Sequence, residues 1–200
     1  VTVRAADGGE DGAVFAEERF TIAVTGENQP PAFTTENFTF GVPESAAVGD
    51  VVGNLLATDP DLPAQALTYT ITAGNDAGAF TIDAATGAVA VTTPLDHETK
   101  DMYGLSVEAT DGVAGSPADI ATVTITVTDV NEAPVIAAQE FTVAENAAPG
   151  AGIGTVLADD VDAGQTLAVA ITAGNEGGLF ALSPEGVLTV GGALDHETEP

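Results

Sequence analysis

The sequence contains no cysteine and no tryptophan, and it has only two tyrosines and three basic residues. Without cysteine there is neither a disulfide framework nor thiol chemistry, so the cysteine content does not indicate whether the protein works in an oxidising or a reducing compartment. The acidic residues number 31, which gives a formal net charge of -28. A surface of that sign is not expected to bind nucleic acid or an anionic membrane unaided.

Long apolar runs are also missing, because no stretch approaches the roughly 20 residues that a membrane span needs. We therefore expect no membrane insertion within this chain. The chain starts at Val1 and shows no signal-peptide pattern, so we expect a piece of a longer protein. A high net charge can indicate disorder, but a hydrophobic content of 44% predicts a folded acidic protein.

Short motifs recur at intervals of about 100 residues. Leu95-Asp96-His97-Glu98-Thr99 returns as Leu194-Asp195-His196-Glu197-Thr198, and Ile71-Thr72-Ala73-Gly74-Asn75 returns as Ile171-Thr172-Ala173-Gly174-Asn175. Such a period indicates a tandem array. We expect the last strands of one repeat at 1–30, a complete repeat at 31–132, and the front part of a third at 133–200.

Within the complete repeat, apolar residues alternate with Thr-rich positions, which is typical of half-buried strands. The positions that share a face are Leu67, Tyr69 and Ile71; Val89 and Val91; Tyr103, Leu105, Val107 and Ala109; and Ala121, Val123, Ile125 and Val127. Turn residues separate these runs, and no stretch has convincing helical spacing. About seven short strands in 100 residues predict an all-β sandwich.

Acidic residues of the complete repeat fall where strands end and in the connector to the next repeat. They are Glu44, Asp59, Asp61, Asp96, Glu98, Asp111, Asp129 and Glu132. Calcium takes six to eight oxygen ligands from carboxylates, amides and backbone carbonyls. Carboxylates from several loops, with Asn131 among them, have that chemistry.

The chain resembles tandem cadherin repeats of the bacterial style over its whole length. The matching motifs are Pro43-Glu44-Ser45, Ala57-Thr58-Asp59-Pro60-Asp61, Leu95-Asp96-His97-Glu98, Ala109-Thr110-Asp111 and Asp129-Val130-Asn131-Glu132-Ala133-Pro134. The resemblance implies Greek-key, immunoglobulin-like sandwiches with calcium as the cofactor bound between successive repeats.

Carried over residue by residue, the resemblance implies a calcium site at the connector near residue 130. Its ligands would be Glu44, Asp96, Glu98, Asp129, Asn131, Glu132, Asp160 and Asp162. Glu132 replaces the usual Asp, and Ala133 replaces the second Asn of the family motif. The number of calcium ions at this junction could therefore be two or three. The next junction along the chain would use Glu145, Asp195 and Glu197.

A second site is implied near residue 28, with Asn28, Asp59, Asp61 and Asp111 as its ligands. The linker Asp of the family is lost there, as Gly26 or Thr25 depending on the gap. We expect one weakly bound ion at this junction, or none.

Two other interpretations of the acidic motifs are less favoured. His97 and His196, inside Asp-His-Glu, could suggest a zinc site or a His-Asp dyad. Period-two geometry points the middle residue away from its neighbours, so a structural or solvent role is preferred. Paired carboxylates also occur in glycosidases, but these recur once per repeat and not in one cleft, so no enzyme is expected.

The sequence therefore favours a calcium-stiffened extracellular or cell-surface segment that acts in cell–cell or cell–surface adhesion. Its expected partners are adjacent repeats, another adhesin copy or a surface polysaccharide. A passive spacer presenting another domain is the alternative. A carbohydrate-binding module is disfavoured, because so few aromatic residues cannot build a sugar-stacking platform.

Overall fold

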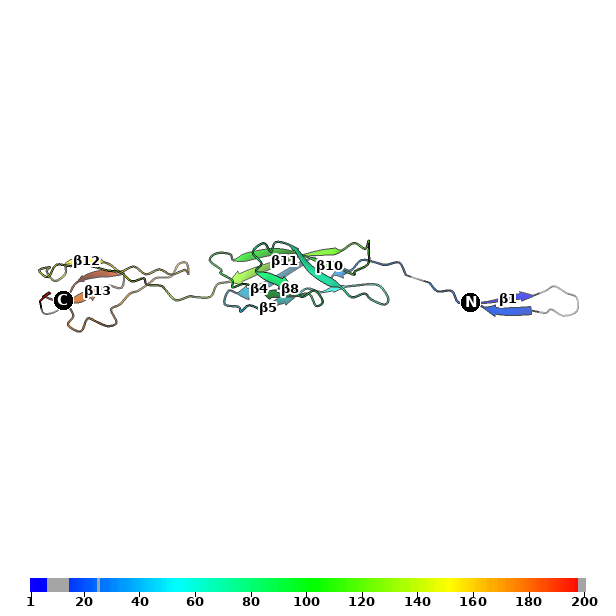
Figure 1. Cartoon of the computed structure of the whole chain (residues 1–200), viewed down its shortest axis with the longest axis horizontal. Coiled ribbons are helices and arrows are strands. Elements are labelled where there is room, and N and C mark those ends of the chain that lie inside the picture. The colour runs from blue at the N-terminus through cyan, green and yellow to red at the C-terminus, as the bar shows by residue number, and fades with distance from the viewer. Residues whose placement is uncertain (7–14, 25, 198–200) are drawn as a thin grey trace. The chain divides into compact units, whose positions relative to one another are not determined.

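The computed structural model describes residues 1–6, 15–24 and 26–197 (Figure 1). Residues 31–132, where a complete repeat is expected, contain nine strand segments, two of them only two residues long. They are β3 (Ala32–Phe33), β4 (Asn37–Pro43), β5 (Val51–Asn54), β6 (Ala57–Thr58), β7 (Thr68–Ala73), β8 (Phe80–Ile82), β9 (Ala88–Val91), β10 (Met102–Thr110) and β11 (Asp119–Thr128). No helix occurs in the described residues, so none there could cross a membrane.

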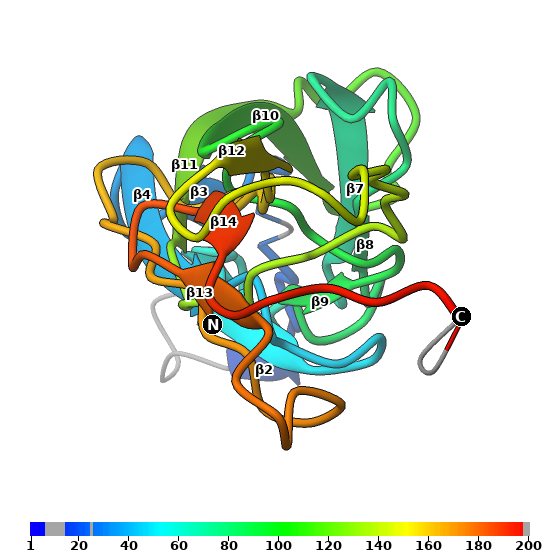
Figure 2. The same ribbon diagram turned by 90° about the vertical axis from the view of Figure 1, so that its left-hand side faces the viewer.

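The strands of this repeat form two main sheets. One has the order β4-β11-β10-β7 and the other β5-β9-β8, while β3 pairs with β6. Figure 2 shows β4 on one side of the β10–β11 pair and β7 on the other. The expected all-β sandwich is confirmed.

The alternation in the sequence places the core as predicted. Leu105, Val107, Val123 and Ile125 are at most 1% exposed, on facing positions of the long β10–β11 ladder. Leu105 lies opposite Val123, and Tyr103 lies opposite Ile125. These two strands are the longest in the part of the chain that the structure describes. β10 ends just before Asp111 and β11 just before Asp129.

The first segment folds as a hairpin of β1 (Thr2–Ala6) and β2 (Phe15–Arg19). Val3 lies opposite Glu18, as Val107 lies opposite Ala121 in the complete repeat. The hairpin thus has the register that the sequence repeat predicts for a last strand pair. Val3 is 50% exposed, whereas Val107 is fully buried.

The third segment contains β12 (Gly152–Thr155), β13 (Phe180–Leu182) and β14 (Val187–Val190), in the order β12-β14-β13. That order repeats β5-β9-β8. The stretch 167–171 matches β7 in sequence but is not a strand in the structure. β7 pairs with β10, and no described strand takes the place of β10 beside 167–171.

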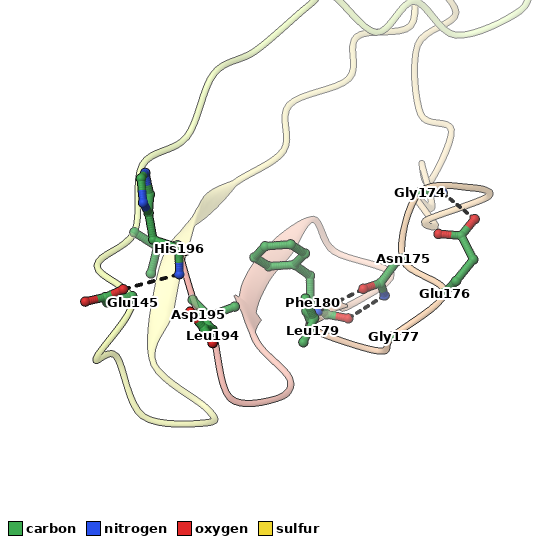
Figure 3. Close-up of a pocket in the computed structure, with 11 residues that line it drawn as sticks. Glu145, Gly174, Asn175, Glu176, Gly177, Leu179, Phe180, Leu194, Asp195 and His196 are labelled. Carbon is green, nitrogen blue, oxygen red and sulfur yellow. Dashed lines mark hydrogen bonds between the residues drawn. The ribbon is translucent and has the colours of Figure 1, made fainter. Parts of the chain in front are cut away.

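Two side-chain devices explain why the repeated motifs recur. The Asn75 side chain bonds both the N–H and the carbonyl of Phe80, at 3.2 and 2.6 Å. Asn175 does the same with Phe180, at 3.0 and 2.7 Å (Figure 3). Gly53 leaves room for the ring of Phe40, which would lie only 2.3 Å from a Cβ there.

The chain divides into two compact units, and the division does not follow the repeats. The second unit joins Val42–Ser45 and Leu95–Asp101 to Val127–Pro200. All eight ligands expected near residue 130 therefore belong to this unit, and the four expected near residue 28 belong to the first. The repeat boundaries remain a prediction.

The first prediction concerns the β10–β11 core. Leu105→Ala should lower the free energy of unfolding by about 2–5 kcal/mol, because it leaves a cavity in a fully buried site. Leu56→Ala, at a side chain that is 58% exposed, should change it by less than about 1 kcal/mol. Urea unfolding in chelator measures both, and equal losses would contradict this core assignment.

Candidate metal centre

Glu44 ties three segments of the chain together just after β4 ends. Its backbone N–H donates to the Thr128 carbonyl at 3.1 Å. Its carboxylate accepts the N–H of Val130 at 2.7 Å and the N–H of His97 at 2.8 Å. The end of β4, the turn at 97–99 and the connector after β11 are thereby held beside one another.

The turn at 97–99 presents Glu98 to the connector. Asp96 closes this turn, since its side chain accepts the Thr99 N–H at 2.7 Å and its carbonyl accepts the Lys100 N–H at 2.9 Å. Carboxylate oxygens of Glu44, Glu98 and Glu132 then lie within 4.8 Å of one another. Asp96 is outside that trio, although it lines the same hollow.

The connector also holds the two aspartates that follow in the third repeat. The Glu132 N–H donates to Asp162 at 2.9 Å, and the Asp162 N–H donates to Asp160 at 3.0 Å. Three buried oxygens in this group have no hydrogen-bond partner: Glu132 Oε2, Asp160 Oδ2 and Asp162 Oδ1. Buried carboxylate oxygens without donors are costly, and bound cations are one way to satisfy such oxygens.

The electrostatics of the group favour a cation for the same reason. Burial, and after it the charges of Glu44 and Asp162, together raise the pKa of Glu132 to about 7. The pKa of Asp129 is also raised, first by desolvation and then by Asp162 and Glu98. Like charges this close repel one another, and a cation bound among them would offset the repulsion.

The second expected group lies near residue 28 and is better supplied with donors. Asn28 donates to Asp111 at 3.0 Å, and Ser116 donates to the same carboxylate at 2.7 Å. These hydrogen bonds, with the N–H of Val113, lower the pKa of Asp111. Asp59 still has a buried oxygen without a partner.

The two groups share one hydrogen-bond pattern, which aligns their connectors. The Gln29 N–H donates to Asp61 at 3.0 Å, as the Glu132 N–H does to Asp162. Gln29 thus takes the place of Glu132. By the same alignment Gly26 takes the place of Asp129, while Thr25 lies outside the described residues. The connector near 28 therefore lacks the two carboxylates that Asp129 and Glu132 provide in the connector near 130.

Sequence reasoning missed a glutamine in each group. Gln165 Nε2 donates to Asn131 Oδ1 and to Asp162 Oδ2, both at 2.9 Å. Gln65 makes the equivalent bonds to Asn28 at 2.6 Å and Asp61 at 3.4 Å. Its own Oε1 is buried and unpartnered. The signal in the sequence was the recurrence of Gln 100 residues apart, a few positions after each Asp-x-Asp.

The orientation expected for His97 is wrong. Its Nδ1 lies 3.1 Å from Glu98 Oε1, because residues 97–99 form a turn and not an extended strand, so period-two geometry does not apply. The hydrogen bond with Glu98 is the main cause of a raised pKa at His97. Glu145, Asp195 and Glu197 also come together, with ligand oxygens within 4.8 Å.

Comparison with known proteins gives one family. The cadherin domain model matches residues 38–128. Human Protocadherin Fat 1 is 36% identical to this chain; the match covers 99% of this chain and 4% of that protein. Human Cadherin-12 is also 36% identical, and that match covers 83% of this chain and 23% of Cadherin-12. A crystal structure of mouse Cadherin-23 EC22-24 superposes with a TM-score of 0.65 at 29% identity, covering 97% of this chain and 64% of that one. The chain spans a small part of the curated relatives.

The second prediction follows from the raised pKa of Glu132. Between its ordinary value of 4.5 and about 7, the folded state binds more protons than the unfolded state. Stability without metal should therefore decrease as the pH rises through that range. Melting curves in chelator from pH 4.5 to 7.5 measure the decrease.

Glu132→Gln should flatten this pH dependence, since it removes the titrating carboxyl. Glu36→Gln, an exposed glutamate outside the group, should leave it unchanged. A decrease of the same size in the Glu132→Gln protein would show that another group carries it.

Proposed function

Because residues 38–128 are a cadherin domain and the chain belongs to that family, we propose that calcium bound by the 129–132 connector fixes one repeat against the next. The stiffened array would then act in extracellular adhesion. The single observation that carries this proposal is the set of buried, unpartnered oxygens on Glu132, Asp160 and Asp162.

The ligand set that we propose for this junction is the one expected from the sequence, in two layers. Glu44, Glu98 and Glu132 form the compact trio, and Asp160 and Asp162 supply the unpartnered oxygens. Asp129, Asn131 and Asp96 complete the proposed set. Oxygens alone make up this set, and oxygen is what calcium takes as a ligand.

The charge of the proposed ligand set indicates how many ions it would bind. Seven carboxylates of the proposed set carry seven formal negative charges: Glu44, Asp96, Glu98, Asp129, Glu132, Asp160 and Asp162. About two or three divalent ions would neutralise most of that charge, with six to eight oxygens around each. Without them, mutual repulsion should loosen the connector.

The group near residue 28 should bind more weakly. Asn28, Asp59, Asp61 and Asp111 remain its proposed ligands, and Asp111 already receives three hydrogen bonds. We propose one weak ion at this site.

Adhesion is the function that the family supports. Proteins with cadherin domains are extracellular adhesion proteins that bind calcium, and they are not enzymes. The partner that we propose is another copy of the same array. The relatives named above are animal proteins and give no support to a surface polysaccharide, and the bacterial character suggested by the sequence stays a prediction. A passive stiff spacer remains the second candidate, since the same calcium sites would serve it.

The third prediction tests calcium binding. Calorimetric titration should show binding of about two or three ions. At a free calcium concentration 100 times Kd, each site should raise the free energy of unfolding by about 2.7 kcal/mol. Melting curves in calcium and in chelator provide the second measurement.

A pair of double variants of equal charge makes the test specific. Glu98→Gln with Asp129→Asn should abolish most of the heat and of the thermal shift. Glu36→Gln with Glu140→Gln, which removes two exposed charges elsewhere, should retain both. No heat and no shift in the unmodified protein would refute the proposed function.

A further inference from the structure

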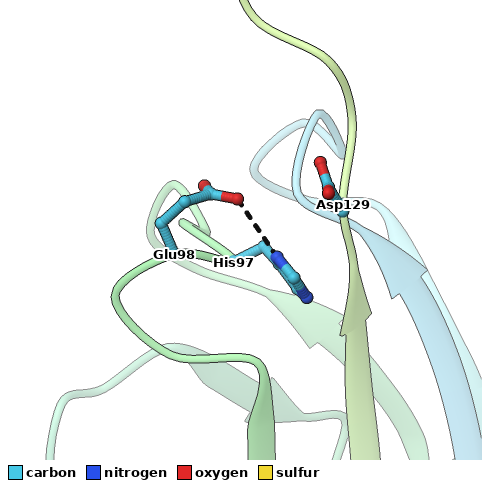
Figure 4. A group of neighbouring side chains, drawn as sticks. All are labelled: His97, Glu98 and Asp129. Carbon is cyan, nitrogen blue, oxygen red and sulfur yellow. Dashed lines mark hydrogen bonds and ion pairs between the residues drawn. The ribbon is translucent and has the colours of Figure 1, made fainter. Parts of the chain in front are cut away.

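His97 stands at the edge of the proposed calcium group with its side chain held in place. Its backbone N–H is anchored on Glu44, and its Nδ1 contacts Glu98 Oε1 at 3.1 Å. Figure 4 shows Asp129 beside this pair, at the end of β11. One ligand atom from each of His97, Glu98 and Asp129 lies within 4.8 Å of the others.

Space for an ion and its water exists at this trio. A hollow of about 560 Å³ is lined by His97, Glu98, Thr99, Asp101 and Asp129, with Val161 and Ala163. The side chains of His97 and Glu98 are 31% and 26% exposed, so they are partly shielded and still reachable. Around a tetrahedral ion with bonds of about 2.0–2.2 Å, ligand atoms stand about 3.3 Å apart. The 3.1 Å contact between His97 Nδ1 and Glu98 Oε1 is close to this spacing, and a ligand atom of Asp129 lies within 4.8 Å of both.

The nitrogen ligand decides the chemical class of the ion. Calcium and magnesium take oxygen ligands, whereas zinc and its neighbours bind imidazole with carboxylates. We propose that His97 Nδ1, Glu98 and Asp129 bind a zinc-type divalent ion, with water completing its coordination. Two carboxylates and a neutral imidazole carry two negative charges, which balance such an ion.

This site would share ligands with the calcium group. Glu98 also belongs to the trio with Glu44 and Glu132, and Asp129 belongs to the proposed calcium set. A zinc-type ion and calcium should therefore compete. The competition rests on the proposed function, but the His97 site itself does not.

The third repeat supplies a matched control within the same chain. His196 stands in the same Asp-His-Glu motif, and its N–H donates to Glu145 at 3.2 Å. The ligand cluster there consists of Glu145, Asp195 and Glu197, without the histidine. His196 should therefore contribute no ion binding of this kind.

The fourth prediction is tested with Co²⁺ as a spectroscopic probe for zinc, on the full chain without a histidine tag or calcium. Co²⁺ absorption should saturate at one ion that Zn²⁺ displaces. Loss of an outer-shell partner alone weakens metal binding about 10–100-fold, so His97→Asn should weaken it at least tenfold. His196→Asn should leave the affinity within about twofold. Equal affinities of the two variants would overturn the site.

Repeating the Co²⁺ titration in the presence of calcium tests this inference separately from the proposed function. If calcium raises the apparent Kd for Co²⁺ in proportion to its concentration, the shared ligands are supported. Co²⁺ binding that depends on His97 but is insensitive to bound calcium would overturn the competition. His97-dependent Co²⁺ binding without any calcium binding would support the site and count against the proposed function.

Discussion

The arrangement of the connector depends above all on the repulsion among the carboxylates that gather there. Glu132 has its pKa raised to about 7 by burial and by its acidic neighbours. One of its own oxygens and one oxygen each of Asp160 and Asp162 are buried without a donor. The protein has only three basic residues to oppose 31 acids. Our proposal is that a divalent cation offsets this repulsion and that the rigidity of the connector depends on it.

The β-sandwich makes this arrangement possible because it fixes where strands end. The buried β10–β11 ladder brings Asp129 and its neighbours out at the same edge as Glu44, which follows β4. Glu44 then accepts N–H groups from the turn at 97–99 and from the connector. The core supplies the stability, while the strand ends carry the charge. The same reasoning predicts a weaker site near residue 28, because Gly26 and Gln29 stand there where Asp129 and Glu132 stand in the connector near 130.

Much of this could be predicted from the sequence, because strands with one buried face alternate with a period of two. Val107, Val123 and Ile125 were placed in the core by that rule and are buried. The resemblance to cadherin motifs pointed to Glu44 and Asp162. What failed depends on local backbone geometry. The turn at 97–99 reverses the orientation expected for His97, and it gives Asp96 the task of closing the turn. The bonds of Gln65 and Gln165 depend on how a long side chain folds back, which spacing alone does not reveal.

The most direct test of the account is a distance distribution across the connector. Because the chain has no cysteine, Ile120→Cys and Val187→Cys provide two exposed labelling sites, one in each compact unit. Pulsed electron-spin measurements should give a narrow distance distribution in calcium and a broad one in chelator. Distributions of equal width in the two conditions would contradict the claim that calcium sets the rigidity of this array.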